Sequence, residues 1–388
     1  MHALYTTQII TTINYYLRKL SESGEVHCAM ASPYALCMAL FLLIMGLLLP
    51  YEVSSSRAGP QLGKTMFERH QEWMLQHGRV YRDAMEQEAR FKIFKENVER
   101  IEAFNSDPNR RFTLAVNHFA DLTDEEFRVT HASGYNRSMT RTASFSGSSV
   151  RPEFYGDYGR PRRSYFRYAN VQGVPPSVDW RQKGAVTPIK YQGSCGDCFA
   201  FASIAAVEGL NAISRGQLVS LSEQEILDCD NSNYKCNGGA MEPTYDFIRD
   251  NGVSTESDYP YRGQQGYCQN AASNPAVQIG GYEDVPRYSE SQMLLAVAHQ
   301  PIAVAVSGGD YYFKYYNSGI MDMECSSGVN HAVAVVGYGV TDDGQKYWIV
   351  KNSWGSNWGD NGYIYIARDV GDPRGLCGIA TDPSYPTM

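Results

Sequence analysis

Two cysteines three residues apart raise the first chemical question about this chain. Cys195 and Cys198 lie in the stretch QGSCGDCFAF, a glycine-rich turn that runs directly into an apolar helical pattern. Cysteines at this spacing fit three arrangements: part of a metal site, a redox-active pair, or one structural and one reactive sulfur. The surrounding sequence has to decide between them.

A reactive cysteine needs neighbours that stabilise its thiolate. A helix N-terminus and an imidazolium can together lower a cysteine pKa from ~8.5 to ~3.5–7.5. Cys198 stands at the start of the apolar pattern, and only His299 and His331 follow Val174. His299 precedes Pro301 and fits a solvated or capping role better, whereas His331 opens a strand pattern that could aim its ring across a groove.

A histidine base is usually oriented through its second nitrogen. Asn352, in KNSWGSNWGDNGY, follows a strand pattern and offers an amide oxygen for that bond. Trp354 stands two residues further on and could cover the pair. Cys198, His331 and Asn352 are therefore the candidate catalytic set.

Two kinds of element must position these residues. Residues 198–214 are apolar on nearly all faces, which predicts a central buried helix, and residues 222–227 and 242–249 read as further helices. From about Tyr282 the β-branched and aromatic runs PIAVAVS, NHAVAVVGYGV, KYWIVKNSW and GYIYIARD predict strands. A helical half followed by a β half indicates an α+β fold with a site between the halves.

The length, composition and charge of the chain indicate a globular protein that does not bind nucleic acid. The chain has 388 residues, and its hydrophobic fraction of 43% is sufficient for a sizeable core. From Val174 onward it carries 13 Lys and Arg against 24 Asp and Glu. This acidic part is a poor candidate for binding nucleic acid.

The N-terminal region contains a stretch that resembles a secretion signal but begins about 30 residues into the chain. An apolar run over residues 34–49 precedes small and polar residues, and it is short for a membrane span. Met30 opens a conventional signal peptide, so residues 1–29 are expected to be an upstream extension and residues 30–58 the signal. The alternative is an uncleaved signal anchor.

Entry into the secretory pathway changes how the cysteines are interpreted. Of nine cysteines, Cys28 and Cys37 fall in the part expected to be removed, which leaves seven. In an oxidising compartment six can pair, so that one thiol remains free.

Upstream of the two halves lie a helical segment and a linker. Residues 66–105 read as one amphipathic helix, and Thr123 to Glu126 as the start of another. Residues 133–173 are rich in Ser, Gly, Arg and Tyr without periodicity, as linkers open to proteolysis are. This linker contains the glycosylation sequon at Asn136.

From Val174 to Met388 the sequence resembles the papain family of cysteine proteases, of the plant papain and bromelain type. The motifs that carry the resemblance are DWRQKGAVTPIKYQGSCGDCFAF, LSEQEILDC, CNGG, DYPY, NHAVAVVGYG and KNSWGSNWGDNGY, in that order. The resemblance implies a papain-like two-domain fold, with residues 174–283 as a helical left part and residues 284–388 as a β-barrel-like right part. It implies Cys198 as nucleophile, His331 as general base and then acid, Asn352 as its orienting group, and Gln192 in the oxyanion hole.

The upstream helices resemble the inhibitory propeptide of that family. The match implies a propeptide over residues 59–132 that fills the groove until cleavage in the 133–173 linker. Ala replaces the usual Gly at position 115. The matched residues are Glu86, Arg90, Phe94, Asn97, Ile101 and Asn105, followed by Ala115, Asn117, Phe119 and Asp121.

The same resemblance answers the question raised by the cysteine pair. No second ligand pair at zinc spacing and no βαβ pattern accompany it, so Cys195 is interpreted as structural and Cys198 as reactive. The family pattern implies the bridges Cys195 to Cys236, Cys229 to Cys268, and Cys325 to Cys377.

Three residues depart from the family pattern. Asp197 precedes the nucleophile where Ser or Ala is usual, Phe199 replaces Trp, and Tyr191 replaces Asn. Asp197 could cap the helix, but its charge would oppose thiolate formation. We therefore expect a higher thiol pKa than is usual for the family.

The resemblance also implies a pocket for the second residue before the scissile bond, called P2. Bulky apolar P2 residues are expected, and Arg as well if the Asp382 carboxylate lies at the pocket floor; the alternative is that Asp382 points to solvent. Backbone contacts to an extended substrate are expected from Gly238 and Gly239. The lining residues implied are Met241, Ala305, Val329, Ala332 and Asp382.

The sequence thus predicts a self-inhibited cysteine endopeptidase without metal or organic cofactor. Its expected partners are protein and peptide substrates, its own propeptide and cystatin-type inhibitors, but not nucleic acid or, after signal removal, a membrane. It is expected to be a monomer that is vacuolar, lysosomal or extracellular. The alternatives are a catalytically impaired homologue that binds or stores, and a propeptide that inhibits other proteases after release.

Overall fold

The computed structural model describes residues 63–135, 166–269, 275–325 and 328–388. The expected signal peptide, Asn136 and most of the linker lie outside these residues. The chain divides into two compact units, and the one described here spans residues 64–388. In the described ranges no helix is both long enough and apolar enough to cross a membrane.

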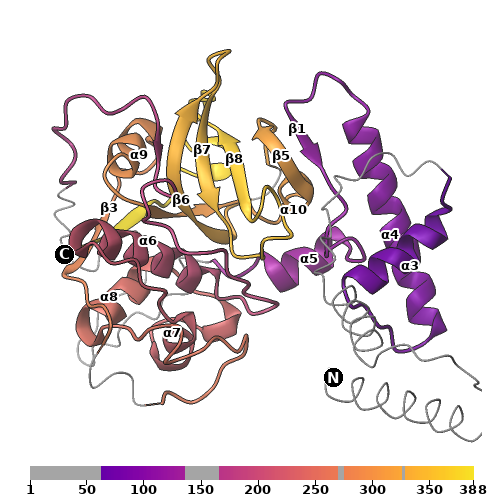
Figure 1. Cartoon of the computed structure of the whole chain (residues 1–388), viewed down its shortest axis with the longest axis horizontal. Helices are drawn as coiled ribbons and strands as arrows, with labels where there is room; N and C mark the ends of the chain where they lie inside the picture. The colour runs from indigo at the N-terminus through magenta and orange to yellow at the C-terminus, as the bar shows by residue number, and fades with distance from the viewer. Residues whose placement is uncertain (1–62, 136–165, 270–274, 326–327) are drawn as a thin grey trace, which may run out of the picture. The chain divides into compact units, whose positions relative to one another are not determined.

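The helical half is built around α6. This helix is buried on nearly every face, as expected from its composition, and ends at Gly216, whose φ of 70° is readily available to glycine. α7 begins after Ser222, whose hydroxyl accepts a hydrogen bond from the Glu225 N–H. Figure 1 shows these helices gathered on one side of the sheet. They are α6 (Cys198–Arg215), α7 (Glu223–Cys229), the short 3-10 helix η2 (Lys235–Asn237) and α8 (Met241–Asn251).

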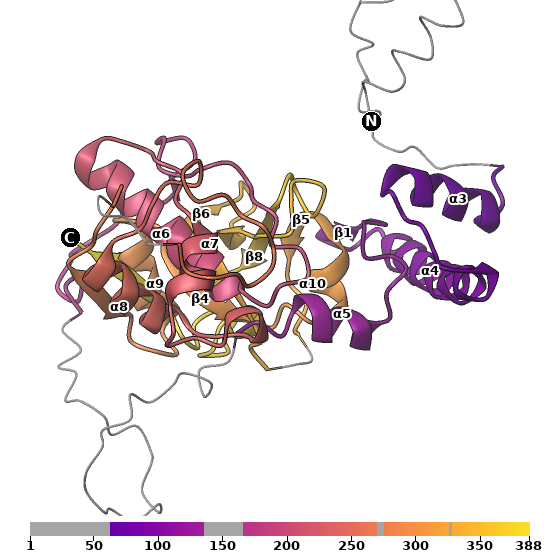
Figure 2. The same ribbon diagram turned by 90° about the horizontal axis from the view of Figure 1, so that it is seen from below.

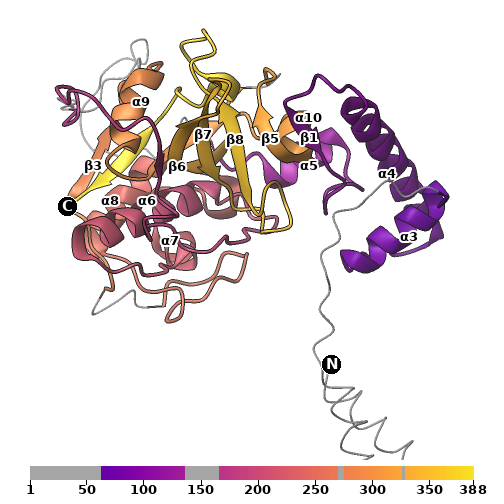
Figure 3. The same ribbon diagram turned by 45° about the horizontal axis from the view of Figure 1, so that its top comes forward.

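The second half is a strongly paired sheet in the order β1-β5-β8-β7-β6-β4-β9-β3, with β2 paired to β6. Neighbouring strands are antiparallel except β5 and β8, which are parallel. Figure 3 shows β6, β7, β8 and β5 side by side. The strands are β1 (Phe112–Leu114), β2 (Val178–Asp179), β3 (Gly281–Asp284), β4 (Ile302–Val306), β5 (Tyr316–Met321), β6 (His331–Val340), β7 (Lys346–Lys351), β8 (Tyr363–Ala367) and β9 (Ser384–Thr387).

The sheet register brings two candidate catalytic residues to one edge. β6 begins at His331, and β7 ends at Lys351, one residue before Asn352. The two strands are antiparallel and Ala334 pairs with Lys351, so the start of β6 lies beside the end of β7. Three further helices belong to this half: α9 (Glu290–Val297), α10 (Tyr311–Tyr315) and the short η3 (Leu376–Gly378).

The two halves do not divide where the sequence suggested. β2 pairs with β6, and Trp180 packs into the core of the β half, so the first residues after Val174 belong there rather than with the helices. β3 pairs with the C-terminal strand β9 across the proposed boundary at 283. Such long-range pairing leaves no local signal in the sequence.

The expected single helix over 66–105 is wrong, because the structure contains two helices. α3 (Met66–Gln76) ends before Gly78, whose φ of 60° is left-handed, and α4 (Ala84–Asn105) begins after Asp83, whose carboxylate accepts from the Glu86 N–H. The expected start at Thr123 is confirmed: Thr123 and Glu126 form a capping box at the start of α5 (Asp124–His131).

The propeptide motif residues fasten α4 to the segment that follows it. The Asn97 amide donates to the carbonyls of Ala120 and Leu122 at 2.9 and 3.2 Å, and Asn105 makes two bonds to the backbone of Leu114. Arg90 reaches the Asp121 carbonyl and the Glu126 carboxylate. Phe94 and Ile101 are buried in the core, while Glu86 accepts from the Arg82 N–H at the start of α4.

The same segment docks onto the β half. β1 extends the sheet by pairing with β5. The Ala115 N–H donates to the Tyr315 carbonyl at 2.9 Å, and the Asn117 amide donates to the Lys314 carbonyl at 2.8 Å. Figure 2 shows β1 and α5 next to α10. The upstream segment is therefore held on the sheet by backbone as well as side-chain bonds.

Candidate active site

Cys198 is fixed at the point where α6 begins. Its side chain is buried, and it is the one free thiol among the described cysteines. The backbone N–H of Ala332, on β6, donates to the sulfur at 3.3 Å. Because the first N–H groups of a helix carry partial positive charge, this position favours a thiolate. The sulfur thus lies where the helical half meets the sheet.

The His331 ring is oriented by Asn352 and covered by Trp354. Its Nε2 lies 2.8 Å from Asn352 Oδ1, which also accepts from the Ser353 N–H at 2.8 Å. Since Oδ1 only accepts, Nε2 carries the proton and Nδ1 of the neutral ring is an acceptor. The Trp354 ring stacks on the imidazole with centroids 4.6 Å apart. Within the described residues Nδ1 has no hydrogen-bonding partner, so it is available to a thiol.

The pKa shifts of Cys198 and His331 favour the neutral form of both groups in this closed state. Burial raises the pKa of the Cys198 thiol to about 12; the Ala332 N–H opposes this rise and Asp197 adds to it. Burial lowers the pKa of His331 to about 4, although the hydrogen bond that its Nε2–H donates to Asn352 favours the protonated ring. Covering the site therefore disfavours a thiolate–imidazolium pair of Cys198 and His331.

Gln192 is buried and bonded through both backbone and side chain. Its N–H donates to the Ser353 carbonyl at 2.9 Å, and its side-chain oxygen accepts from the Ser353 hydroxyl at 2.6 Å. One proton of its amide nitrogen goes to the Cys195 carbonyl at 2.9 Å. A primary amide has a second proton, and among the described residues the Gln192 amide nitrogen makes only the one bond to Cys195.

Residues 133–135 lie against Cys198, although the sequence placed them in the linker. The Gly239 N–H donates to the Gly134 carbonyl at 2.9 Å, and the Tyr135 N–H donates to the Asn330 carbonyl at 3.1 Å. A Cβ on Gly134 would lie 2.9 Å from Cys198 Sγ and 2.6 Å from a backbone oxygen, so only glycine fits. This strand-like segment covers the site.

The pocket residues expected from the family pattern lie together around Tyr135. Met241, Ala305, Val329 and Ala332 share one hydrophobic cluster with Tyr135 and Cys198. Asp382 is buried rather than pointing to solvent, and its carboxylate accepts a hydrogen bond from the Tyr135 hydroxyl. Arg287 also pairs with it at 2.8 Å. The surroundings of Tyr135 are therefore apolar apart from the Asp382 carboxylate.

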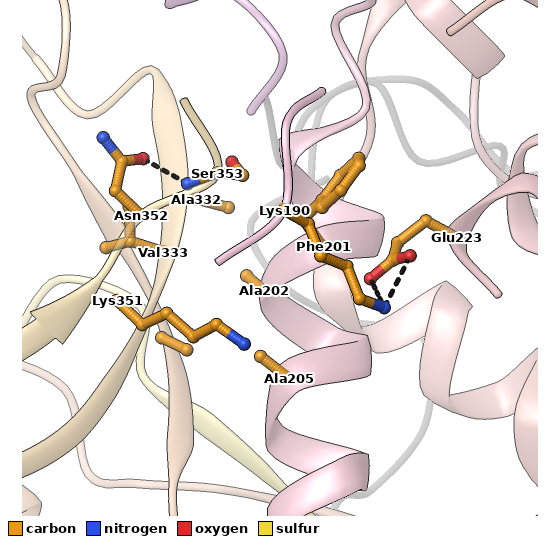
Figure 4. A pocket seen from close by; sticks show the side chains of 11 residues that line it. Lys190, Phe201, Ala202, Ala205, Glu223, Ala332, Val333, Lys351, Asn352 and Ser353 are labelled. Carbon is orange, nitrogen blue, oxygen red and sulfur yellow. Dashed lines mark hydrogen bonds and ion pairs between the residues drawn. The ribbon is translucent and has the colours of Figure 1, made fainter. Parts of the chain in front are cut away.

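A small cavity lies between the two halves, and Ala332 and Asn352 are among the residues that line it. Its volume is about 20 Å³, enough for about one water molecule. Figure 4 shows Lys190 bonded to Glu223 on one side, and Lys351 and Asn352 on the other. Its small size suits a buried water rather than a substrate.

The expectation that Asp197 caps α6 is wrong. Its side chain makes no capping hydrogen bond; instead the carboxyl oxygen Oδ2 lies 2.8 Å from the Tyr261 hydroxyl. The other two departures differ in environment: Phe199 is buried, whereas Tyr191 is half exposed and has its ring 5.8 Å from that of His118.

The cysteines form three disulfides: Cys195–Cys236, Cys229–Cys268 and Cys325–Cys377. These are the pairs that the family pattern implies. In the described ranges no group of three or more His, Cys, Asp or Glu side chains could hold a metal ion.

Sequence reasoning missed several residues that support the site. Ser353 fixes both Asn352 and Gln192, Tyr261 contacts Asp197, and Asn330 receives the Tyr135 N–H. Ser353 and Asn330 each adjoin a predicted residue, which was a usable signal. Tyr261 lies 63 residues after Cys198, so nothing local points to it.

Comparison with known proteins agrees with this architecture. Residues 174–387 match the papain family cysteine protease model, and residues 70–127 match the cathepsin propeptide inhibitor domain. The senescence-specific cysteine protease SAG12 of Arabidopsis thaliana is 48% identical over 328 residues, covering 83% of this chain and 90% of that protein. The thiol protease SEN102 of Hemerocallis is 45% identical, covering 83% and 86%.

Solved proforms have the same fold. The proform of the ragweed pollen allergen Amb a 11, a cysteine protease, superposes with a TM-score of 0.73 at 38% identity, covering 83% of this chain and 94% of that one. A recombinant stem bromelain precursor gives 0.71 at 42% identity, covering 83% and 99%. The chain belongs to the papain family of cysteine proteases.

Its function follows from that membership together with its propeptide. The chain is a papain-like cysteine endopeptidase, a hydrolase of peptide bonds in proteins, made as a zymogen that its own propeptide inhibits. The relatives named above are proteases, and no comparison supports a binding or storage protein.

Proposed function

We propose that Cys198 is the nucleophile and His331 its base. His331 Nδ1 takes the thiol proton, the sulfur attacks the peptide carbonyl, and the same proton then passes to the leaving amine as the C–N bond breaks. Water, deprotonated by His331, hydrolyses the resulting thioester. Asn352 holds the ring in the required tautomer. The 2.8 Å bond between His331 and Asn352, at a helix-borne thiol, is the observation that carries this proposal.

The oxyanion of the tetrahedral intermediate would be bound by the Cys198 backbone N–H and the second amide proton of Gln192. Two fixed donors are effective because they are aimed before the charge develops, and one such donor contributes ~10²–10³ in rate. The four bonds that hold Gln192 support this role.

The deciding experiment is active-site titration of the acid-matured protein with a thiol-directed epoxide, with Cys198→Ala alongside. We expect one label per molecule on Cys198 and a parallel loss of peptidase activity. Labelling of a different residue, or none in a folded protein, would contradict the assignment.

We propose that the pocket around Tyr135 receives the P2 side chain. Its apolar wall suits bulky apolar and aromatic residues, and Tyr gains a bond from its hydroxyl to Asp382. Arg is a poorer fit than expected from the sequence, because Asp382 already pairs with Arg287.

Peptides that differ only in P2 (Leu, Phe, Tyr, Arg) test the pocket on wild type and Asp382→Asn. Because a neutral hydrogen bond contributes about 0.5–1.5 kcal/mol and a charged one about 1.5–3, we expect the Tyr to Phe ratio of kcat/KM to fall by about tenfold in the variant. An unchanged ratio would remove Asp382 from the pocket.

We further propose that the secreted chain loses residues 30–58 as its signal and residues 59–132 with the linker on maturation. The mature enzyme then begins near Val174, works as a monomer in a vacuole or outside the cell, and is open to cystatin-type inhibitors and to glycosylation at Asn136 before cleavage. The disulfides, and the senescence-specific name of the relative SAG12, support a compartment for general protein breakdown. N-terminal sequencing of protein from plant vacuoles and apoplast tests this.

A further inference from the structure

The buried carboxyl group of Asp197 is not used by the mechanism above. The residue is fully buried beside Cys198. In the described part of the chain no Lys, Arg or His pairs with it, and its Oδ1 has no hydrogen-bonding partner. A buried carboxylate without a cation is unfavourable, whereas a neutral carboxylic acid with one good bond is not.

The bond that Asp197 makes leads to the oxyanion hole. Its Oδ2 lies 2.8 Å from the Tyr261 hydroxyl oxygen, and that oxygen lies 2.8 Å from the Gln192 backbone carbonyl. A hydroxyl has one proton, and a carbonyl can only accept. Both bonds are therefore made at full strength only if Tyr261 donates to Gln192 and a protonated Asp197 donates to Tyr261.

The series of hydrogen bonds from Asp197 through Tyr261 ends at the Gln192 backbone and helps to fix its position. Its carbonyl bond to Tyr261 and its N–H bond to the Ser353 carbonyl fix the main chain on both sides of the residue. The side-chain amide that is aimed at the oxyanion projects from this main chain. Loss of the carbonyl bond therefore alters the aim of the amide without touching Cys198 or His331.

We propose that Asp197 is a positioning residue that works as a neutral acid, holding the oxyanion-hole glutamine through Tyr261. The inference rests on the role proposed for Gln192. It explains why an acidic residue beside the nucleophile is compatible with catalysis, because the protonated form carries no charge to oppose the thiolate.

The groups around Asp197 favour its protonated form. Tyr261 and Cys198 face it directly, and Glu223 on α7 and Glu256 lie close enough to Tyr261 to act on it electrostatically. All of these are neutral or acidic. The Tyr261 hydroxyl bond and the backbone N–H groups at the N-terminal end of α6 favour the anion, whereas burial favours the neutral acid. Burial raises the pKa of Asp197 to about 8, opposed by the Tyr261 bond.

The sign of the pH effect follows. Below a pH of about 8 the acid is neutral and the chain of bonds is complete. As pH rises through that value, the carboxylate competes for the Tyr261 proton, the Gln192 carbonyl loses its donor, and negative charge appears beside Cys198. Turnover should therefore decline on the alkaline side for a reason separate from His331.

Asp197→Asn tests the proposal because its amide donates to Tyr261 but does not ionise. We would measure kcat and KM of the acid-matured enzyme from pH 4.5 to 9.5. The expected result is a kcat at pH 5.5 within about threefold of wild type and an alkaline limb moved upward by at least ~0.5 pH unit. An alkaline limb that superposes on the wild-type limb would overturn the proposal.

Tyr261→Phe is the second variant, and it decides the matter if Asp197→Asn does not fold. We expect kcat at pH 5.5 to fall about tenfold, which is part of the ~10²–10³ rate factor that one oxyanion donor contributes. KM should stay within about twofold of the wild-type value. Alkylation of Cys198 by iodoacetamide should keep its rate at that pH, since the thiolate is unaffected. Slower alkylation in proportion to kcat would mean that Tyr261 merely supports the fold.

Tyr259→Phe is the matched control. Tyr259 lies in the same loop, and its hydroxyl also bonds a buried carboxylate, Asp228, at 2.8 Å, but it does not reach Gln192. Its kcat and pH profile should match wild type; a drop equal to that of Tyr261→Phe would overturn the proposal. Epoxide titration of Cys198 in every variant reports separately whether the proposed nucleophile is sound.

Discussion

His331, the proposed catalytic base, shows how one side chain depends on its immediate neighbours. His331 has its protonated nitrogen bonded to Asn352 and one ring face covered by Trp354. Asn352 cannot rotate its amide without losing the Ser353 N–H bond. The tautomer of the base is thus decided by a backbone group one residue further along the chain.

Asn352→Ala should impair the base without removing it. The ring loses its orienting acceptor, so we expect kcat/KM of the mature enzyme to fall about 10- to 100-fold, part of the ~10²–10⁴ that a positioned acid–base group contributes. Peptide hydrolysis and the pH profile of thiol alkylation measure this. Asn317→Ala is the control, because that amide contacts Thr113 of the propeptide. Wild-type activity in Asn352→Ala would exclude the orienting role.

The propeptide elements act as one clamp on the β half. β1 adds a strand to the sheet, α5 follows it, and residues 133–135 then enter the cleft. Phe119 and Phe127 pack edge-on against Trp354 at 5.6 and 5.2 Å. The clamp therefore contacts the same tryptophan that stacks on the His331 ring.

The pKa shifts of His118 and His131 predict that this clamp is sensitive to acid. Burial lowers the pKa of His118 to about 3 and that of His131 to about 4, and neighbouring Arg79 adds to both shifts. Once released, each ring regains a pKa near ~6.5. Protons are therefore taken up on release, and the clamp loses stability as pH falls below about 6.5 towards those lower values.

His131→Phe should shift activation to lower pH. Phenylalanine keeps the aromatic contacts with Phe119 and Phe127 but does not take up a proton. We expect the pH of half-maximal autoactivation to fall by ~0.5 unit. Gel analysis of zymogen processing over a pH series measures this value. His299→Phe, which replaces a ring that stacks on Tyr168 in the β half, is the control. An unshifted pH in His131→Phe would refute the sensing role.

Across the whole molecule, a buried charge cluster joins the two halves behind the site. Lys190 pairs with Glu208 on α6 at 3.0 Å and with Glu223 on α7 at 2.8 Å. Burial opposes its charge, but the two carboxylates outweigh this and raise the pKa of Lys190. Lys351, on β7, donates to Thr187 nearby at 2.8 Å, and Thr187 in turn donates to Glu208.

Lys190→Met should destabilise the fold strongly. The substitution leaves two buried carboxylates without their cation. Breaking a buried ion pair in this way lowers the free energy of unfolding by about 3–5 kcal/mol. Urea unfolding in a Cys198→Ala background, which prevents autolysis, measures the loss. Lys346→Met is the matched control, since its pair with Asp369 is half exposed and contributes about 0–1 kcal/mol. Equal losses in the two variants would contradict a special role for the buried cluster.

The local features of this chain could be predicted from its sequence. The apolar run after Cys198 predicted α6, and the β-branched runs predicted β4, β6, β7 and β8. Thr123 predicted the start of α5. Periodicity and caps act over a few residues, so they leave a readable pattern. The candidate catalytic residues followed from residue types placed at the ends of such elements.

Contacts between distant segments could not be predicted in this way. The pairing of β1 with β5 and of β2 with β6, the entry of Tyr135 into the cleft, and the bond from Asp197 to Tyr261 each join residues far apart in the sequence. Even the role of Asp197 changed, from helix cap to buried acid. Burial and hydrogen-bond partners are set by which segments pack together, and that is a property of the folded chain rather than of any local stretch.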